Sequence, residues 1–128
     1  MLVSPSDVVA KAKATIKECT VSQVKDCLGA DTLMIDIREP AEYTRGHIPG
    51  SIHIPRGLLE FEIIPTLAKL GVHDNPENKD IVLYCGTGGR SALAAYALDA
   101  MGFRNVKSLD GGIVAWAEAK MPLETPTV

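Results

Sequence analysis

Residues that bind metals or form disulfides are scarce in this sequence. Its 128 residues include three cysteines and three histidines. The cysteines, Cys19, Cys27 and Cys85, are odd in number and form no C-x-x-C pair, and the histidines make no ligand-spaced cluster with them. These features argue against a disulfide scaffold and against a zinc site, so we expect no metal.

The sequence also lacks the charge and the apolar runs that mark nucleic-acid-binding and membrane proteins. The formal net charge of -3 gives no basic footprint for nucleic acid. No segment approaches the roughly 18 apolar residues of a membrane span, and the first ten residues have neither the basic start nor the apolar core of a signal peptide. We therefore expect a cytoplasmic protein with no nucleic-acid or membrane partner. A chain of 128 residues fits one compact domain.

Short apolar runs alternate with helical patterns along most of the chain. Helix-start signals at Pro5 and at the capping box of Thr20 and Gln23 predict two early helices, the second ending at Gly29. The predicted strands are residues 33–37, 51–54, 81–84 and 106–109, and the predicted later helices are residues 57–70, 91–101 and 112–119. This alternation predicts an α/β fold with a mainly parallel sheet.

A glycine-rich turn joins the third of these strands to the helix that follows it. Cys85 lies at the carboxyl end of the strand, where open parallel sheets bind ligands. Glycines let successive backbone N–H groups converge on one point, and the helix N-terminus adds its positive dipole end. Arg90 contributes a planar fork of donors that suits an oxyanion. Such surroundings favour the thiolate, so we expect Cys85 to be a nucleophile in an anion-binding loop.

Each residue of this turn also has a structural explanation. A cysteine at a strand end can be a small buried hydrophobe, the glycines can form a tight connection, and Ser91 can cap the helix. That explanation treats the residues one by one. It does not account for a thiol, three glycines and an arginine within a single turn.

The turn also matches a known active-site pattern. Residues 85–91 fit the C-x-x-G-x-R-S pattern of the rhodanese family, which the sequence resembles over residues 20–122. Three further segments agree in the family's order, namely residues 36–43 (DIREPAEY), 46–52 (GHIPGSI) and 109–116 (LDGGIVAW). The resemblance implies helices on both faces of the sheet. It leaves residues 1–19 as an N-terminal helical extension and residues 123–128 as a flexible C-terminal tail.

The resemblance implies sulfur transfer through a persulfide on Cys85. The thiolate would take the outer sulfur of thiosulfate or of a persulfide and pass it to a small thiophile, a thiol or a protein acceptor. No metal and no cofactor are implied. Cys85 would be the catalytic residue, and the donor-binding residues would be Gly86, Thr87, Gly88, Gly89, Arg90 and Ser91.

Two other functions remain open. Cysteine phosphatases and arsenate reductases on a similar scaffold place five residues between cysteine and arginine and a histidine before the cysteine, whereas here the spacing is four and the preceding residue is Tyr84. A non-catalytic rhodanese module used for binding or regulation is the other alternative, although Cys85 is present. Members of the family that use thiosulfate well often carry extra basic side chains in the loop, whereas this loop has Arg90 alone. The resemblance therefore implies that thiosulfate is a poor or surrogate donor.

Other polar and aromatic residues in the matching segments are interpreted as structural. We expect Arg38 to pair with Glu39 or Glu42. We expect His47 to lie in a turn that leads into a strand, and Trp116 to pack in the core.

The two remaining cysteines are candidate sulfur acceptors. Cys19 and Cys27 could take sulfur from Cys85 or form a disulfide with it, but both fall at or in the expected early helices. We interpret them as buried or idle thiols.

Overall fold

Five parallel strands form the centre of the fold. The computed structural model describes residues 1–27 and 31–126, and the strands of its sheet lie in the order β1-β5-β4-β2-β3. Every neighbouring pair is parallel. In chain order the strands are β1 (Lys17–Cys19), β2 (Leu33–Asp36), β3 (Ile52–His53), β4 (Ile81–Tyr84) and β5 (Val106–Leu109).

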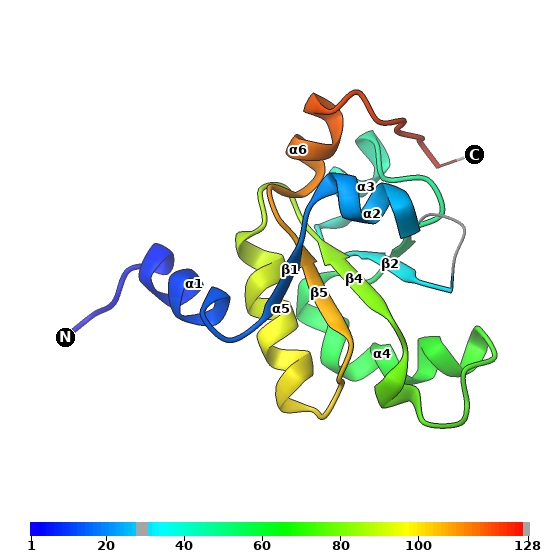
Figure 1. Cartoon of the computed structure of the whole chain (residues 1–128), viewed down its shortest axis with the longest axis horizontal. Helices are drawn as coiled ribbons and strands as arrows, with labels where there is room; N and C mark the ends of the chain where they lie inside the picture. Colours follow the sequence, from blue (N-terminus) through cyan, green and yellow to red (C-terminus); the bar gives the residue numbers. More distant parts are fainter. Residues whose placement is uncertain (28–30, 127–128) are drawn as a thin grey trace.

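Helices cover both faces of this sheet (Figure 1). The helices are α1 (Pro5–Lys13), α2 (Val21–Cys27), α3 (Pro40–Arg45), α4 (Leu59–Lys69), α5 (Gly89–Ala100) and α6 (Gly112–Glu118), with 3-10 turns η1 (Arg56–Leu58) and η2 (Pro76–Asn78). The apolar residues of α4 and α5 pack on one face with Ile81 and Leu83, and those of α2 and α6 pack on the other with Val82 and Tyr84. No helix within residues 1–27 and 31–126 is long and apolar enough to cross a membrane.

Strand β4, with the sequence IVLY, has no charged residue because of its place in the sheet. Successive side chains of a strand point to opposite faces, and both faces of this sheet are covered. All four residues of β4 are therefore buried. The strand ends at Tyr84, so Cys85 follows directly at the carboxyl edge of the covered sheet.

The α/β fold with a parallel sheet and helices on both faces is confirmed. Two elements lie outside the predicted set, the edge strand β1 and the short helix α3. Helix α5 begins at Gly89, two residues before the predicted start, because the glycine turn leads directly into it. The predicted end of the second helix, Gly29, falls outside the described residues.

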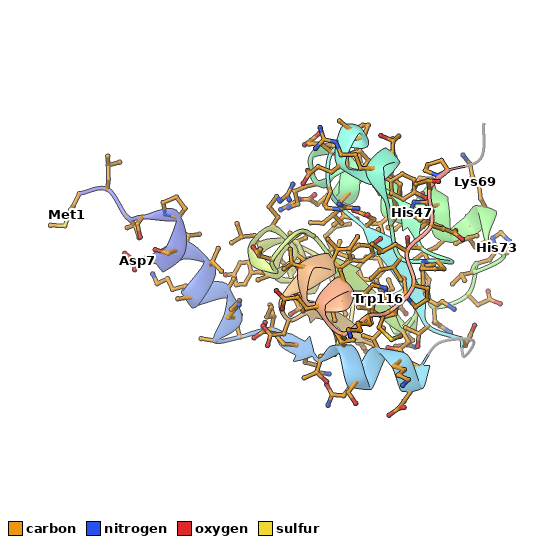
Figure 2. The ribbon with its side chains drawn as sticks, turned by 90° about the horizontal axis from the view of Figure 1, so that it is seen from above. Met1, Asp7, His47, Lys69, His73 and Trp116 are labelled. Carbon is orange, nitrogen blue, oxygen red and sulfur yellow. The ribbon has the colours of Figure 1, made fainter. Side chains whose placement is uncertain are left out.

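Helix α1 lies beside α5 and off the sheet (Figure 1). The Ser4 hydroxyl accepts a hydrogen bond from the Asp7 N–H at 3.1 Å, and Pro5 occupies the first turn. Ala12 is 5% exposed, so the helix has one buried position. Figure 2 shows Met1 and Asp7 at the end of the molecule farthest from Trp116 and His47.

Candidate active site

The sulfur of Cys85 lies at the centre of the turn between β4 and α5. The backbone N–H groups of Gly88 and Ser91 point to it, with N to Sγ distances of 3.1 Å and 3.4 Å. Cys85 is 1% exposed, so these N–H groups face the sulfur in place of water. Two converging donors at a helix N-terminus stabilise negative charge on sulfur.

A buried pair of serine hydroxyls lies below the sulfur. The Ser91 Oγ is 3.6 Å from the Cys85 Sγ and 2.7 Å from the Ser108 Oγ. Ser91 and Ser108 are both fully buried. Both the hydroxyl and the backbone N–H of Ser91 therefore face the Cys85 sulfur, the hydroxyl from within the core.

Helix α6 holds the turn from its other side. The N–H of Ile113 donates to the Cys85 carbonyl at 2.9 Å, and the N–H of Val114 donates to the Gly86 carbonyl at 3.1 Å. A Cβ on Gly112 would lie 2.5 Å from both carbonyl oxygens, so only a glycine permits this approach. The Gly111-Gly112 segment therefore supports the cysteine loop.

The guanidinium of Arg90 is held by a carboxylate from α3. Its two terminal nitrogens donate to the two carboxylate oxygens of Glu42 at 2.8 Å and 3.0 Å. The hydrogen bond from Arg90 lowers the pKa of Glu42 to about 2. The pKa of Arg90 is raised, first by the hydrogen bond to Glu42 and further by the charge of that carboxylate. Both partners are therefore charged at neutral pH. The Glu42 carboxylate neutralises the Arg90 cation, which the sequence predicts to bind an anionic donor.

The comparisons with known proteins agree with this geometry. A family model for the rhodanese-like domain matches residues 20–119. The chain belongs to the rhodanese-like family. The match includes α6 and begins after α1 and β1, so those two elements lie outside the matched part.

Two relatives carry sulfurtransferase names. A protein named sulfurtransferase from Allochromatium vinosum is 35% identical over 96 residues, which are 75% of this chain and 81% of that protein. A probable adenylyltransferase/sulfurtransferase, MoeZ, from Mycobacterium tuberculosis is 40% identical over 105 residues, which are 80% of this chain and 25% of that protein. The chain spans a quarter of this longer relative.

A solved structure resembles the chain over nearly its whole length. It is a protein of unknown function from Rhodopseudomonas palustris, described as a possible tyrosine phosphatase, with a TM-score of 0.82 and 35% identity. The alignment covers 97% of this chain and 96% of that protein. The similarity therefore extends beyond the rhodanese-like match and into the N-terminal segment.

The loop residues of the predicted site differ in their surroundings. Gly88 has a φ of +104°, a left-handed conformation, and lies against the backbone of Gly111. Thr87 and Arg90 are exposed, and Gly86 and Gly89 are half-buried. The structure therefore divides the turn into an inner part around the sulfur and an outer rim that is exposed to solvent.

A pocket of about 510 Å³ opens on this rim. The loop contributes Cys85, Thr87 and Arg90 to its lining. Apolar side chains of α1 also line it, among them Val8 and Val9. The pocket therefore brings the cysteine loop and α1 together at the surface.

Arg38 does not pair with Glu39 or Glu42 as the sequence analysis predicts. Its Nε donates to both oxygens of the Asp36 carboxylate at 3.1 Å and 3.2 Å. One terminal nitrogen donates to the same carboxylate at 2.8 Å and to the Gly46 carbonyl at 2.7 Å. Both charged side chains are buried. Arg38 thus fixes the connection between β2 and α3, and Glu42 is left to hold Arg90.

His47 and Trp116 have partners in the fold. The ring of His47 stacks on Tyr43 with 4.1 Å between centroids, and its backbone N–H donates to the Glu124 carbonyl at 2.9 Å. Trp116 is fully buried, and its indole N–H donates to the Pro122 carbonyl at 2.7 Å. These contacts tie the C-terminal segment to α6 and to the connection between α3 and β3.

Cys19, which is expected at or in an early helix, is the last residue of strand β1. It is 5% exposed, and burial raises the pKa of its thiol to about 11. At neutral pH it is therefore a protonated thiol. Cys27 is at the end of α2 and is half-buried.

Proposed function

We propose that the protein is a sulfurtransferase in which Cys85 carries sulfane sulfur as a persulfide. The observation that supports this most is the pair of N–H groups, from Gly88 and Ser91, directed at the Cys85 sulfur. Family membership and the sulfurtransferase names of relatives add to it. The donor would be thiosulfate or a small persulfide, and the acceptor a small thiophile, a thiol or a protein thiol.

The first step is attack by the Cys85 thiolate on the outer sulfur of the donor. With thiosulfate, a bond forms between the two sulfur atoms and the bond from the outer sulfur to the sulfonate sulfur breaks. The bonding pair leaves with sulfite, and the outer sulfur remains on Cys85 as a negatively charged persulfide. No proton is transferred, so the step needs no general base.

The second step restores the thiolate. An acceptor such as cyanide attacks the terminal sulfur, the sulfur–sulfur bond breaks, and thiocyanate leaves while the electron pair returns to Cys85. Because negative charge stays on sulfur through both steps, fixed N–H donors stabilise each state. The Gly88 and Ser91 N–H groups are in position for the inner sulfur, and the rim of the loop would receive the outer one.

The supporting residues would keep this cradle rigid. The bonded hydroxyls of Ser91 and Ser108 fix the sulfur from the core side, and Gly112 allows α6 to fix the loop carbonyls. A cradle that is already ordered loses little free energy to reorganisation when charge moves along the sulfur chain.

A phosphatase is the second candidate, because the similar structure from Rhodopseudomonas palustris is described as a possible tyrosine phosphatase. Two features of this chain disfavour it. Four residues separate Cys85 from Arg90, which makes a cradle suited to one sulfur atom and small for a tetrahedral phosphate. Both terminal nitrogens of Arg90 are also bonded to Glu42, whereas phosphate binding would need that fork free.

A paired activity assay tests the proposal against this alternative. Wild type and Cys85→Ser are assayed for thiocyanate formation from thiosulfate and cyanide, and for hydrolysis of p-nitrophenyl phosphate. We expect thiocyanate from wild type only, and phosphate ester hydrolysis from neither. Phosphatase activity that depends on Cys85, without thiocyanate, would replace the proposal with the second candidate. Equal thiocyanate formation by Cys85→Ser would remove Cys85 from the mechanism.

A further inference from the structure

The wall of the Cys85 pocket formed by α1 is apolar and lies outside the part of the chain that matches the rhodanese-like model. Val8 and Val9 line the same pocket as Cys85 and Arg90 of the loop, and Leu93 of α5 adds a further apolar side chain to the lining. Val8 is 44% exposed, so its side chain is free to contact a bound molecule.

Helix α1 is fixed in this place by the fold. Ala12 is buried, and a methyl group of Val9 lies 3.7 Å from where a Cβ on Gly89 would stand, which is van der Waals contact distance. The Ser4 cap and Pro5 set the start of the helix. The apolar wall therefore stands at a defined distance from the loop.

The charges on the rim favour donors with little negative charge. Arg90 is the cation of the rim, and Glu42 occupies both of its terminal nitrogens. A thiolate on Cys85 leaves the Cys85, Arg90 and Glu42 group with one net negative charge. A doubly charged donor such as thiosulfate therefore meets repulsion, and a singly charged donor meets less.

We propose that α1 completes the donor pocket of Cys85 and selects singly charged sulfane-sulfur donors whose carrier group is apolar. The inference rests on the proposed function, because it names the donor class of the same cysteine. For an organic thiosulfonate, the Cys85 thiolate bonds to the outer sulfur and the bond to the sulfonyl sulfur breaks. The electron pair leaves with the organic sulfinate, whose apolar group lies against Val8 and Val9.

The test compares three donors in wild type, Val8→Ser and Ile64→Ser with cyanide as acceptor. Thiosulfate is doubly charged, methanethiosulfonate is singly charged with a small carrier, and benzenethiosulfonate is singly charged with a large apolar carrier. Ile64, on α4, is a matched control because it is a β-branched helical residue with 50% exposure. For each donor, kcat/KM of the variant is divided by kcat/KM of wild type, and this ratio cancels the differences in reactivity between the leaving groups.

We expect Val8→Ser to lower kcat/KM for benzenethiosulfonate by about tenfold, as for lost apolar contact in a specificity pocket. The values for thiosulfate and methanethiosulfonate should change by less than about twofold, and Ile64→Ser should leave all three unchanged. Circular dichroism and the melting temperature confirm that both variants fold.

Two results would overturn the inference and leave the proposed function in place. One is an equal loss of kcat/KM for all three donors in Val8→Ser, and the other is no loss for any. If wild type forms thiocyanate from none of the donors, the proposed function itself fails. The two failures are therefore distinguished by the wild-type measurement.

Discussion

At the scale of single residues, the pair of Arg90 and Glu42 decides how the loop meets an anion. An arginine next to a nucleophilic cysteine predicts an anion site from sequence alone. Glu42, which is 48 residues from Arg90 in the chain, changes that prediction. Its carboxylate already binds both terminal nitrogens of the guanidinium. A donor must share Arg90 with a permanent carboxylate.

Replacing Glu42 with glutamine should therefore improve the use of thiosulfate. The change removes a negative charge beside Arg90 and keeps the side chain's length, and we expect kcat/KM for thiosulfate to rise about threefold. The pKa of Glu42 is lowered to about 2, so the carboxylate stays charged and the gain should persist at every assay pH above about 5. Steady-state thiocyanate assays at several pH values measure it.

Glu62→Gln is the control for the change in net charge, because Glu62 lies exposed on α4. It should leave kcat/KM near the wild-type value. A fall in kcat/KM for thiosulfate in Glu42→Gln would show that Glu42 orients Arg90 for the donor and does not compete with it.

The lowered pKa of Glu42 also makes the stability of the fold depend on pH. The ion pair stabilises the fold above about pH 4.5, and this contribution is lost as the pH falls toward 2.

At the scale of elements, the cysteine loop depends on the start of α6. The sequence shows Gly111 and Gly112 as the start of a helix, and their contact with the loop follows from the neighbouring positions of β4 and β5 in the sheet. Gly112 has a φ of +58° and leaves no room for a Cβ beside the carbonyls of Cys85 and Gly86.

Gly112→Ala should accordingly damage both the fold and the site. A Cβ 2.5 Å from two carbonyl oxygens forces the loop and α6 apart, and we expect the free energy of unfolding to fall by more than about 3 kcal/mol. Gly102→Ala is the matched control, because Gly102 has a φ of +104° with nothing within 4 Å of its Cβ position. Gly102→Ala should lower the free energy of unfolding by about 1 kcal/mol, the cost of placing an alanine in a left-handed backbone conformation. Equal losses in urea unfolding would contradict the role given to Gly112.

The elements that sequence patterns do not predict are short or polar. Strand β1 has three residues, and the two charged ones, Lys17 and Glu18, are exposed at the sheet edge, so it lacks an apolar alternation. Helix α3 has six residues and begins at Pro40, which is too short for a helical period to show. Helix α3 matters for the site, because it supplies Glu42.

At the scale of the whole molecule, the fold class and the loop of residues 85–91 follow from sequence because they are local in the chain. Apolar runs identify the buried strands, and the cysteine, glycines and arginine of the turn are contiguous. The partners of that turn are brought to it from the rest of the chain. Glu42, Ser108, Gly112 and the valines of α1 reach it only through the order of strands and the packing of α1 on α5.

The covalent state of Cys85 during turnover is the central claim of this account. Intact mass measured after brief incubation with thiosulfate or benzenethiosulfonate, and again after cyanide, tests it directly in wild type and Cys85→Ser. We expect wild type to gain one sulfur atom, roughly 32 Da, and to lose it on addition of cyanide, as nucleophilic catalysis by a thiolate requires. The Cys85→Ser protein should gain nothing. A folded, reduced wild type that gains no mass from either donor, or a variant that gains as much as wild type, would contradict the account.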